Sequence, residues 1–209
     1  MKYQELKRKF NNVPVFSSSN LMSLSENHGT LKYQLNYWCK QGLVLKLRRG
    51  LYTLNHDDRK IGLSPLFIAS QLRFPSYVSS QYALSIYSLI PEKTIGVTSV
   101  TTRKTVEYNN NFGTFIYQHI KPYCFNGFTE KKDENDLIYY LADPEKALLD
   151  FFYFNLSNIP SDDIQIFSES FRINRDVDID LFKLKNNLRL YESKKLNQIT
   201  DNFIKYWRE

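Results

Sequence analysis

The fold of the first third of this chain is decided by residues 28–54, whose sequence is HGTLKYQLNYWCKQGLVLKLRRGLYTL. Leu31, Leu35 and Trp38 recur in steps of four and three residues, which is the spacing that puts apolar side chains on one face of an α-helix. The run ends at Gly42, a residue type that readily adopts the left-handed backbone that commonly closes a helix. This part of the stretch therefore predicts an amphipathic helix that stops just before Gly42.

The period of the sequence changes after this helix. Leu43, Leu45 and Leu47 alternate with other residues, which is the pattern of a half-buried β-strand. Arg49-Gly50 predicts a tight turn, and residues 51–54 return as a second strand. The stretch therefore predicts a helix followed by a hairpin with a basic tip.

Two shorter helices are expected before this stretch. Tyr3, Leu6 and Phe10 form the apolar stripe of the first, and Ser17-Ser18-Ser19 offers N-caps for the second. Short helices followed by a basic hairpin have the order of a winged helix-turn-helix. In that fold the third helix enters the major groove of DNA, and the hairpin, or wing, lies along the backbone or the minor groove. We therefore expect residues 1–62 to form a winged helix-turn-helix DNA-binding domain.

The polar face of the third helix carries groups that can read bases. Asn36 suits a bidentate contact with adenine, and Lys40 suits guanine or phosphate. The candidate major-groove residues are Thr30, Tyr33, Asn36, Tyr37 and Lys40. The candidate phosphate or minor-groove residues of the wing are Lys46, Arg48 and Arg49. For each side chain the alternative is an ordinary solvated position, and winged helices also bind proteins.

The charge of the chain is distributed unevenly. The 209 residues carry a formal net charge of +6. Residues 1–62 hold 11 Lys and Arg against 4 Asp and Glu, whereas residues 63–209 hold 17 against 18. All the excess positive charge therefore lies in the first third, as expected when a nucleic-acid-binding module is joined to a neutral module with another task. Random scatter of charge is the alternative.

A charged, turn-like linker at residues 56–60 sets the domain boundary near residue 62, so residues 63–209 form the second domain. We expect this domain to be mixed α+β. Its predicted helices begin at Pro65, at Ser80, at Pro144 and after Asp180, and its predicted strands cover residues 95–102, 112–120 and 137–141. The first two strands are expected to form a hairpin whose tip is residues 109–111.

Lys146 and Asp150 stand four residues apart in the helix that begins at Pro144. We expect them to pair on the helix surface. A buried polar cluster with Ser76-Tyr77 is the alternative.

The sequence gives little support to an enzyme. It has no Walker-type phosphate loop, no G-x-G-x-x-G and no H-E-x-x-H motif. Asp176, Asp178 and Asp180 have the spacing of carboxylates that hold two metals in nucleotidyl transfer, but Asp180 is placed to cap a helix. We therefore expect no catalytic residue, no metal and no cofactor.

The sequence also predicts a cytoplasmic protein. Cys39 and Cys124 are far apart and fit a reducing compartment. No stretch has the length and apolarity of a membrane helix, and the first residues are charged.

Several segments spread along the chain resemble one family when they are taken together. They are residues 42–52 (GLVLKLRRGLY), 75–84 (PSYVSSQYAL), 89–92 (LIPE), 97–104 (VTSVTTRK), 115–120 (FIYQHI) and 142–150 (ADPEKALLD). In this order and spacing they resemble the AbiEi-type antitoxins of bacterial abortive-infection toxin–antitoxin systems. The resemblance covers about residues 5–205.

The resemblance implies a division of work between the two domains. The N-terminal winged helix would bind inverted repeats in the promoter of its own operon and repress it. The second domain would counteract an AbiEii-type nucleotidyltransferase toxin, with or without a stable complex. Two other functions remain open on the residues alone, namely a ligand-responsive winged-helix transcription regulator and a nucleic-acid-processing enzyme.

Overall fold

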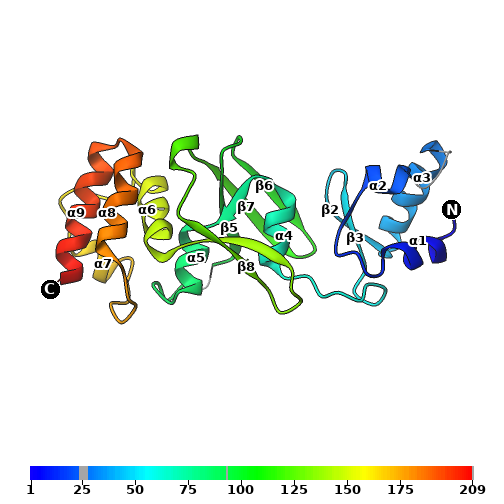
Figure 1. Ribbon diagram of the computed structural model, residues 1–209, viewed down its shortest axis with the longest axis horizontal. Helices are drawn as coiled ribbons and strands as arrows, with labels where there is room; N and C mark the ends of the chain where they lie inside the picture. Colours follow the sequence, from blue (N-terminus) through cyan, green and yellow to red (C-terminus); the bar gives the residue numbers. More distant parts are fainter. Residues whose placement is uncertain (24–27, 93, 209) are drawn as a thin grey trace.

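The structure is a computed structural model that describes residues 1–23, 28–92 and 94–208. It is a mixed α+β fold, which confirms the predicted class. Figure 1 shows three blocks that follow one another along the longest axis of the molecule: the N-terminal helices with a small sheet, a large sheet, and the C-terminal helices. The two chain ends lie at opposite ends of the molecule.

The N-terminal block follows the predicted order of helices and hairpin. Its elements are α1 (Tyr3–Phe10), β1 (Phe16–Ser17), α2 (Ser18–Met22), α3 (His28–Lys40), β2 (Val44–Arg48) and β3 (Leu51–Leu54). β3 pairs antiparallel with both β1 and β2, so the small sheet has the order β1-β3-β2. The core of this block contains the buried side chains of Leu6, Phe10, Phe16, Leu21, Leu31, Leu35, Trp38, Val44 and Leu54.

Two predicted helix ends are confirmed by their hydrogen bonds. Ser17 Oγ accepts a bond from the backbone N–H of Asn20 at 3.1 Å, and the Asn20 side chain accepts one from the backbone N–H of Ser17 at 2.9 Å. Gly42 has φ +70°, and the N–H of Leu43 donates to the Trp38 carbonyl at 3.0 Å. This pattern is a Schellman motif, in which a left-handed residue lets the chain leave the helix while its last carbonyls stay paired.

The predicted leucine alternation in β2 was wrong. The buried residues are Val44 and Leu47, whereas Leu45 is only half-buried. The reason is that both faces of this strand are covered, since Val44 packs in one hydrophobic core and Leu47 in another. A β-bulge also shifts the register with β3 between Lys46 and Arg48, so that Leu47 is the extra residue of this strand.

The central block is a mixed sheet that was predicted only in part. Its order is β6-β7-β5-β4-β9-β8, with the strands β4 (Ser76–Val78), β5 (Gly96–Thr101), β6 (Val106–Asn110), β7 (Gly113–His119), β8 (Phe128–Lys132) and β9 (Ile138–Ala142). The predicted strands at 95–102, 112–120 and 137–141 correspond to β5, β7 and β9. The helices α4 (Pro65–Leu72) and α5 (Ser80–Ile86) pack against β5.

The predicted hairpin between the first two of these strands was wrong. β5 and β7 are parallel, with Gly96 opposite Thr114 and Thr101 opposite His119. The turn after Asn110 instead joins β7 to the antiparallel strand β6. β6 escaped the sequence reasoning because its residues, VEYNN, are half-buried or exposed and carry little apolar signal.

The C-terminal block contains α6 (Pro144–Phe154), α7 (Ile166–Glu169), α8 (Leu181–Leu188) and α9 (Lys194–Arg208), with a 3₁₀ turn η2 (Arg189–Tyr191) between the last two. Another 3₁₀ turn, η1 (Pro122–Cys124), follows β7. The Asp180 side chain accepts bonds from the backbone N–H groups of Phe182 and Lys183 at 2.9 and 3.0 Å, which confirms the predicted cap. Pro144 occupies the first turn of α6, as predicted.

The β2–β3 hairpin is shared between two hydrophobic cores. Val44 and Leu54 belong to the N-terminal core, whereas Leu47 and Leu51 belong to the core that the large sheet and the C-terminal helices form. Residues three apart in a strand point to opposite faces, so Val44 and Leu47 on β2, like Leu54 and Leu51 on β3, face different cores.

Candidate nucleic-acid interface

α3 presents one polar face to solvent. Tyr33 and Tyr37 are 79% and 60% exposed, which is unusual for side chains of this size. Leu31, Leu35 and Trp38 face the core, as their spacing requires. The predicted major-groove residues Thr30, Tyr33, Asn36, Tyr37 and Lys40 are all exposed along this one helix.

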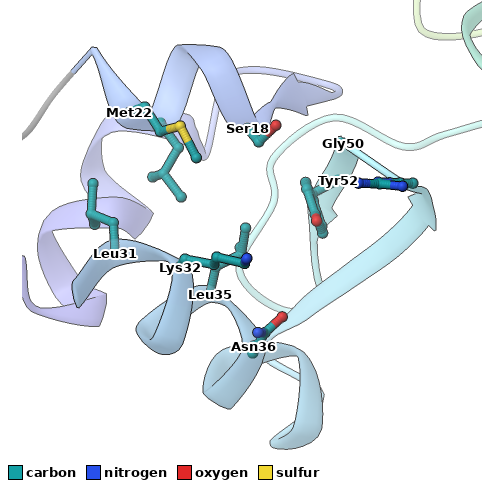
Figure 2. A pocket seen from close by; sticks show the side chains of 10 residues that line it. Ser18, Met22, Leu31, Lys32, Leu35, Asn36, Gly50 and Tyr52 are labelled. Carbon is teal, nitrogen blue, oxygen red and sulfur yellow. The ribbon is translucent and has the colours of Figure 1, made fainter. Parts of the chain in front are cut away.

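A groove runs between this helix and the hairpin. Its volume is about 570 Å³. Its lining residues come from α2, α3 and the β2–β3 turn, and Figure 2 shows Lys32 and Asn36 on α3 facing Gly50 and Tyr52 of the hairpin. Lys32, Asn36 and Arg49 supply its main polar groups, and none of the described residues that line it is acidic. The groove is therefore cationic and bounded by the helix and the wing-like hairpin.

The three predicted cations of the hairpin lie in different surroundings. Lys46 is exposed and lies near Cys39 of α3. Burial raises the pKa of the Cys39 thiol, and the positive charge of Lys46 partly offsets this rise. Arg49 is exposed at the turn and lines the groove. Arg48 is half-buried, and its guanidinium donates to the Arg49 carbonyl at 3.0 Å. Lys46 and Arg49 are therefore the more accessible cations, and Lys32 adds one that sequence reasoning missed.

Described acidic side chains of the N-terminal block are paired away from this groove. Asp58 accepts from Lys7 Nζ and from the Tyr3 hydroxyl, both at 2.5 Å. Burial of Asp58 opposes its ionisation, but the bonds from Lys7 and Tyr3 outweigh it and lower the pKa of the carboxyl. Glu5 lies 3.8 Å from Lys9 on α1. The field at the groove is therefore set by Lys32, Lys46 and the arginines.

The Asp58 contacts predict a pH-dependent contribution to stability. A carboxyl whose pKa is lowered on folding stabilises the folded state above its unfolded pKa of about 3.9, and this contribution is lost as the pH falls through the lower folded value. Asp58→Asn should cost about 1 kcal/mol at pH 7, a modest value because Lys7 is 37% exposed and solvent screens its charge. Urea unfolding of the wild type and the variant at pH 7 and pH 3 measures this loss in the free energy of unfolding. The difference from wild type should shrink at pH 3, and Asp57→Asn, an exposed neighbour, is the control.

A second polar cluster lies where α6 packs against β4 and η2, and its side chains are buried. Lys146 Nζ lies 2.5 Å from Asp150 Oδ1, and both side chains are 0% exposed. The Asp150 carboxylate also accepts from the hydroxyls of Tyr77 at 3.0 Å, Ser79 at 2.7 Å and Tyr191 at 2.5 Å. The predicted surface pair was therefore wrong, because β4 and η2 cover this face of α6.

The surroundings of this cluster fit a structural role. Lys146 donates to the Tyr191 hydroxyl, and its ammonium lies 4.8 Å from the Tyr191 ring centroid and 5.5 Å from that of Tyr77. A Cβ atom on Gly127 would lie 3.1 Å from the Lys146 side chain, so glycine permits the close approach of the loop before β8. The cluster joins β4, α6 and η2, and its donors and acceptors satisfy one another.

The carboxylates of residues 176–180 do not converge on one point. Asp180 caps α8, and the backbone N–H of Asp180 donates to the buried Glu145 at 3.0 Å. Asp176 and Asp178 are exposed. Over residues 1–23, 28–92 and 94–208, no group of three or more His, Cys, Asp or Glu side chains could hold a metal ion.

Comparisons with known proteins assign the chain to no family. No family model matches the chain, and no curated protein matches it. Among the described residues, no helix is both long and apolar enough to cross a lipid bilayer.

Proposed function

We propose that residues 1–62 form a winged helix that binds double-stranded DNA, with α3 in the major groove and the β2–β3 hairpin as the wing. The observation that carries this proposal is the cationic groove between α3 and the turn that holds Arg49, to which Lys32 and Asn36 of α3 contribute at the edge of its exposed face. An α-helix fits the B-DNA major groove, and a neighbouring basic hairpin then reaches phosphates or the minor groove.

The proposed base contacts come from the exposed face of α3. Asn36 would pair with adenine, and Lys40 with guanine or phosphate. Thr30, Tyr33 and Tyr37 would cover thymine methyl groups or donate hydroxyl bonds. Lys46, Arg48 and Arg49 would hold phosphates, with Lys32 beside them.

This proposal predicts a change in salt dependence. Replacing both Arg48 and Arg49 with alanine should weaken binding to the upstream promoter fragment and lower the salt slope by about two, one for each lost phosphate contact. Arg49→Ala alone should give about half of this change. The measurement is a mobility-shift titration at several salt concentrations.

The matched control removes the same charge at the far end of the chain, from the exposed Arg189 and Arg208. Its slope should equal that of the wild type. An unchanged slope in the Arg48 and Arg49 variant would remove both residues from the interface.

We further propose that the chain is an AbiEi-type antitoxin of the cytoplasm that represses its own operon and counteracts an AbiEii-type nucleotidyltransferase toxin. The resemblance of its motifs and the division of charge support this. The full chain carrying Asn36→Ala and Arg49→Ala should still rescue growth in cells that express such a toxin, while it loses repression. Loss of rescue together with repression would contradict a division of work between the two parts.

A further inference from the structure

The tip of the β2–β3 hairpin is held by the central block. Leu47 and Leu51 are 2% and 8% exposed, and both are buried in the core of the large sheet. In Figure 1, β2 and β3 lie on the side of the N-terminal block that faces this sheet. The part of the hairpin that carries Arg49 therefore takes its apolar support from residues beyond 62.

Polar contacts fix the hairpin against the turn between β6 and β7. The Asn110 side-chain amide donates to the Leu47 carbonyl at 3.1 Å, at the bulge of β2. The other end of the same amide accepts from the backbone N–H of Phe112 at 2.8 Å. The Arg59 guanidinium, just after the hairpin, lies 5.4 Å from the centroid of the Phe112 ring.

These contacts restrain the backbone of the hairpin and therefore the positions of its basic side chains. An isolated two-stranded hairpin is only marginally stable in water. β3 pairs with a strand on each side, but β2 is an edge strand of the small sheet and pairs with β3 alone. The Leu47 carbonyl follows Lys46 and precedes the two arginines, so the bond from Asn110 restrains the segment that bears all three charges.

We propose that Asn110 and Phe112 are positioning residues for DNA binding: the β6–β7 turn holds the wing in the geometry that places Lys46 and Arg49 beside α3. This inference rests on the proposed function. It also couples the two parts of the chain, because any partner that moves the β6–β7 turn changes DNA affinity, and DNA in turn changes affinity for that partner by the same factor.

The test uses a nearly isosteric change in the full chain. Asn110→Asp keeps the oxygen that accepts from Phe112 but replaces the amide donor with an oxygen that faces the Leu47 carbonyl. Asn111→Asp, at the next and exposed position, adds the same charge and leaves the bond intact. Three quantities are compared between these variants: amide exchange of residues 44–54 in the free protein, affinity for the promoter duplex, and the urea midpoint.

Relative to Asn111→Asp, the Asn110→Asp variant should show at least about fivefold faster hairpin exchange, the equivalent of one hydrogen bond. Its DNA affinity should fall about tenfold, while α9 exchange and the urea midpoint stay nearly the same. DNA should slow exchange at residues 106–113 in the control but not in the variant.

Equal hairpin exchange and equal DNA affinity in the two variants would overturn the positioning role, provided that the wild type binds DNA. A wild-type chain that ignores the duplex would overturn the proposed function itself, and the positioning role with it.

Discussion

Replacing Asp150 with alanine is expected to lower the free energy of unfolding by about 3–5 kcal/mol, because it leaves a buried ammonium without its counter-charge. Lys146 is 0% exposed and cannot reach water. The change also removes the acceptor of the hydroxyls of Tyr77, Ser79 and Tyr191. A loss of this size takes a large share of the stability of a typical domain, and urea unfolding followed by circular dichroism measures it.

Two further variants show whether the buried charge is the cause. Glu5→Ala breaks an exposed pair with the same four-residue spacing and should cost less than about 1 kcal/mol. The double change of Lys146→Met with Asp150→Asn removes both charges, keeps a side-chain oxygen that accepts from these hydroxyls, and should recover most of the loss. A double variant as unstable as Asp150→Ala would show that packing, and not the unpaired charge, dominates.

Replacing Asn36 with alanine is expected to lower affinity for the specific operator by about 1–3 kcal/mol, or roughly 5- to 150-fold, while non-specific DNA binding stays nearly unchanged. Asn36 is exposed in the middle of α3 and lines the groove. Alanine is a better helix former than asparagine, so the helix itself should not be weakened. Fluorescence anisotropy with the promoter duplex and a scrambled duplex gives both affinities.

The control for this change is Asn186→Ala, which alters an exposed asparagine on α8 at the other end of the molecule. It should bind both duplexes as the wild type does. If Asn36→Ala weakens binding to both duplexes equally, Asn36 contacts the backbone rather than a base, and the assignment of α3 as the reading helix loses its support.

Local signals of the sequence were enough to predict many of the elements. Gly42 at the end of α3, Pro144 at the start of α6 and the Asp180 cap act within a few residues of their own position. Such effects depend on backbone geometry that neighbouring residues set. The hairpin turn at Arg49-Gly50 belongs to the same group.

Features that depend on distant parts of the chain could not be predicted in this way. The parallel pairing of β5 and β7 requires the chain to return through β6, which lies at the edge of the sheet beyond β7 and has no apolar pattern. The Lys146–Asp150 pair has the spacing of a surface pair, and only tertiary packing against β4 and η2 buries it.

The sequence predicted most of the residues of the candidate interface, but not the contacts with the rest of the chain that hold the hairpin in place. The exposed face of α3 agrees with the helical spacing, and the cations of the hairpin follow from its sequence. The bulge between Lys46 and Arg48 and the contact of Asn110 with Leu47 depend on distant parts of the chain, and so does the burial that leaves Arg48 half-buried while Arg49 is exposed. Lys32 was missed because its position on α3 borders the groove only once the hairpin is in place.

We expect the cationic N-terminal block to bind the DNA upstream of its own gene. The most direct test titrates the purified full chain against that promoter fragment and a scrambled fragment of equal length, at about 50 and 200 mM salt. We predict preferential binding to the promoter fragment, with an affinity that falls steeply as the salt concentration rises. Absence of binding to either fragment at the lower salt concentration would contradict it.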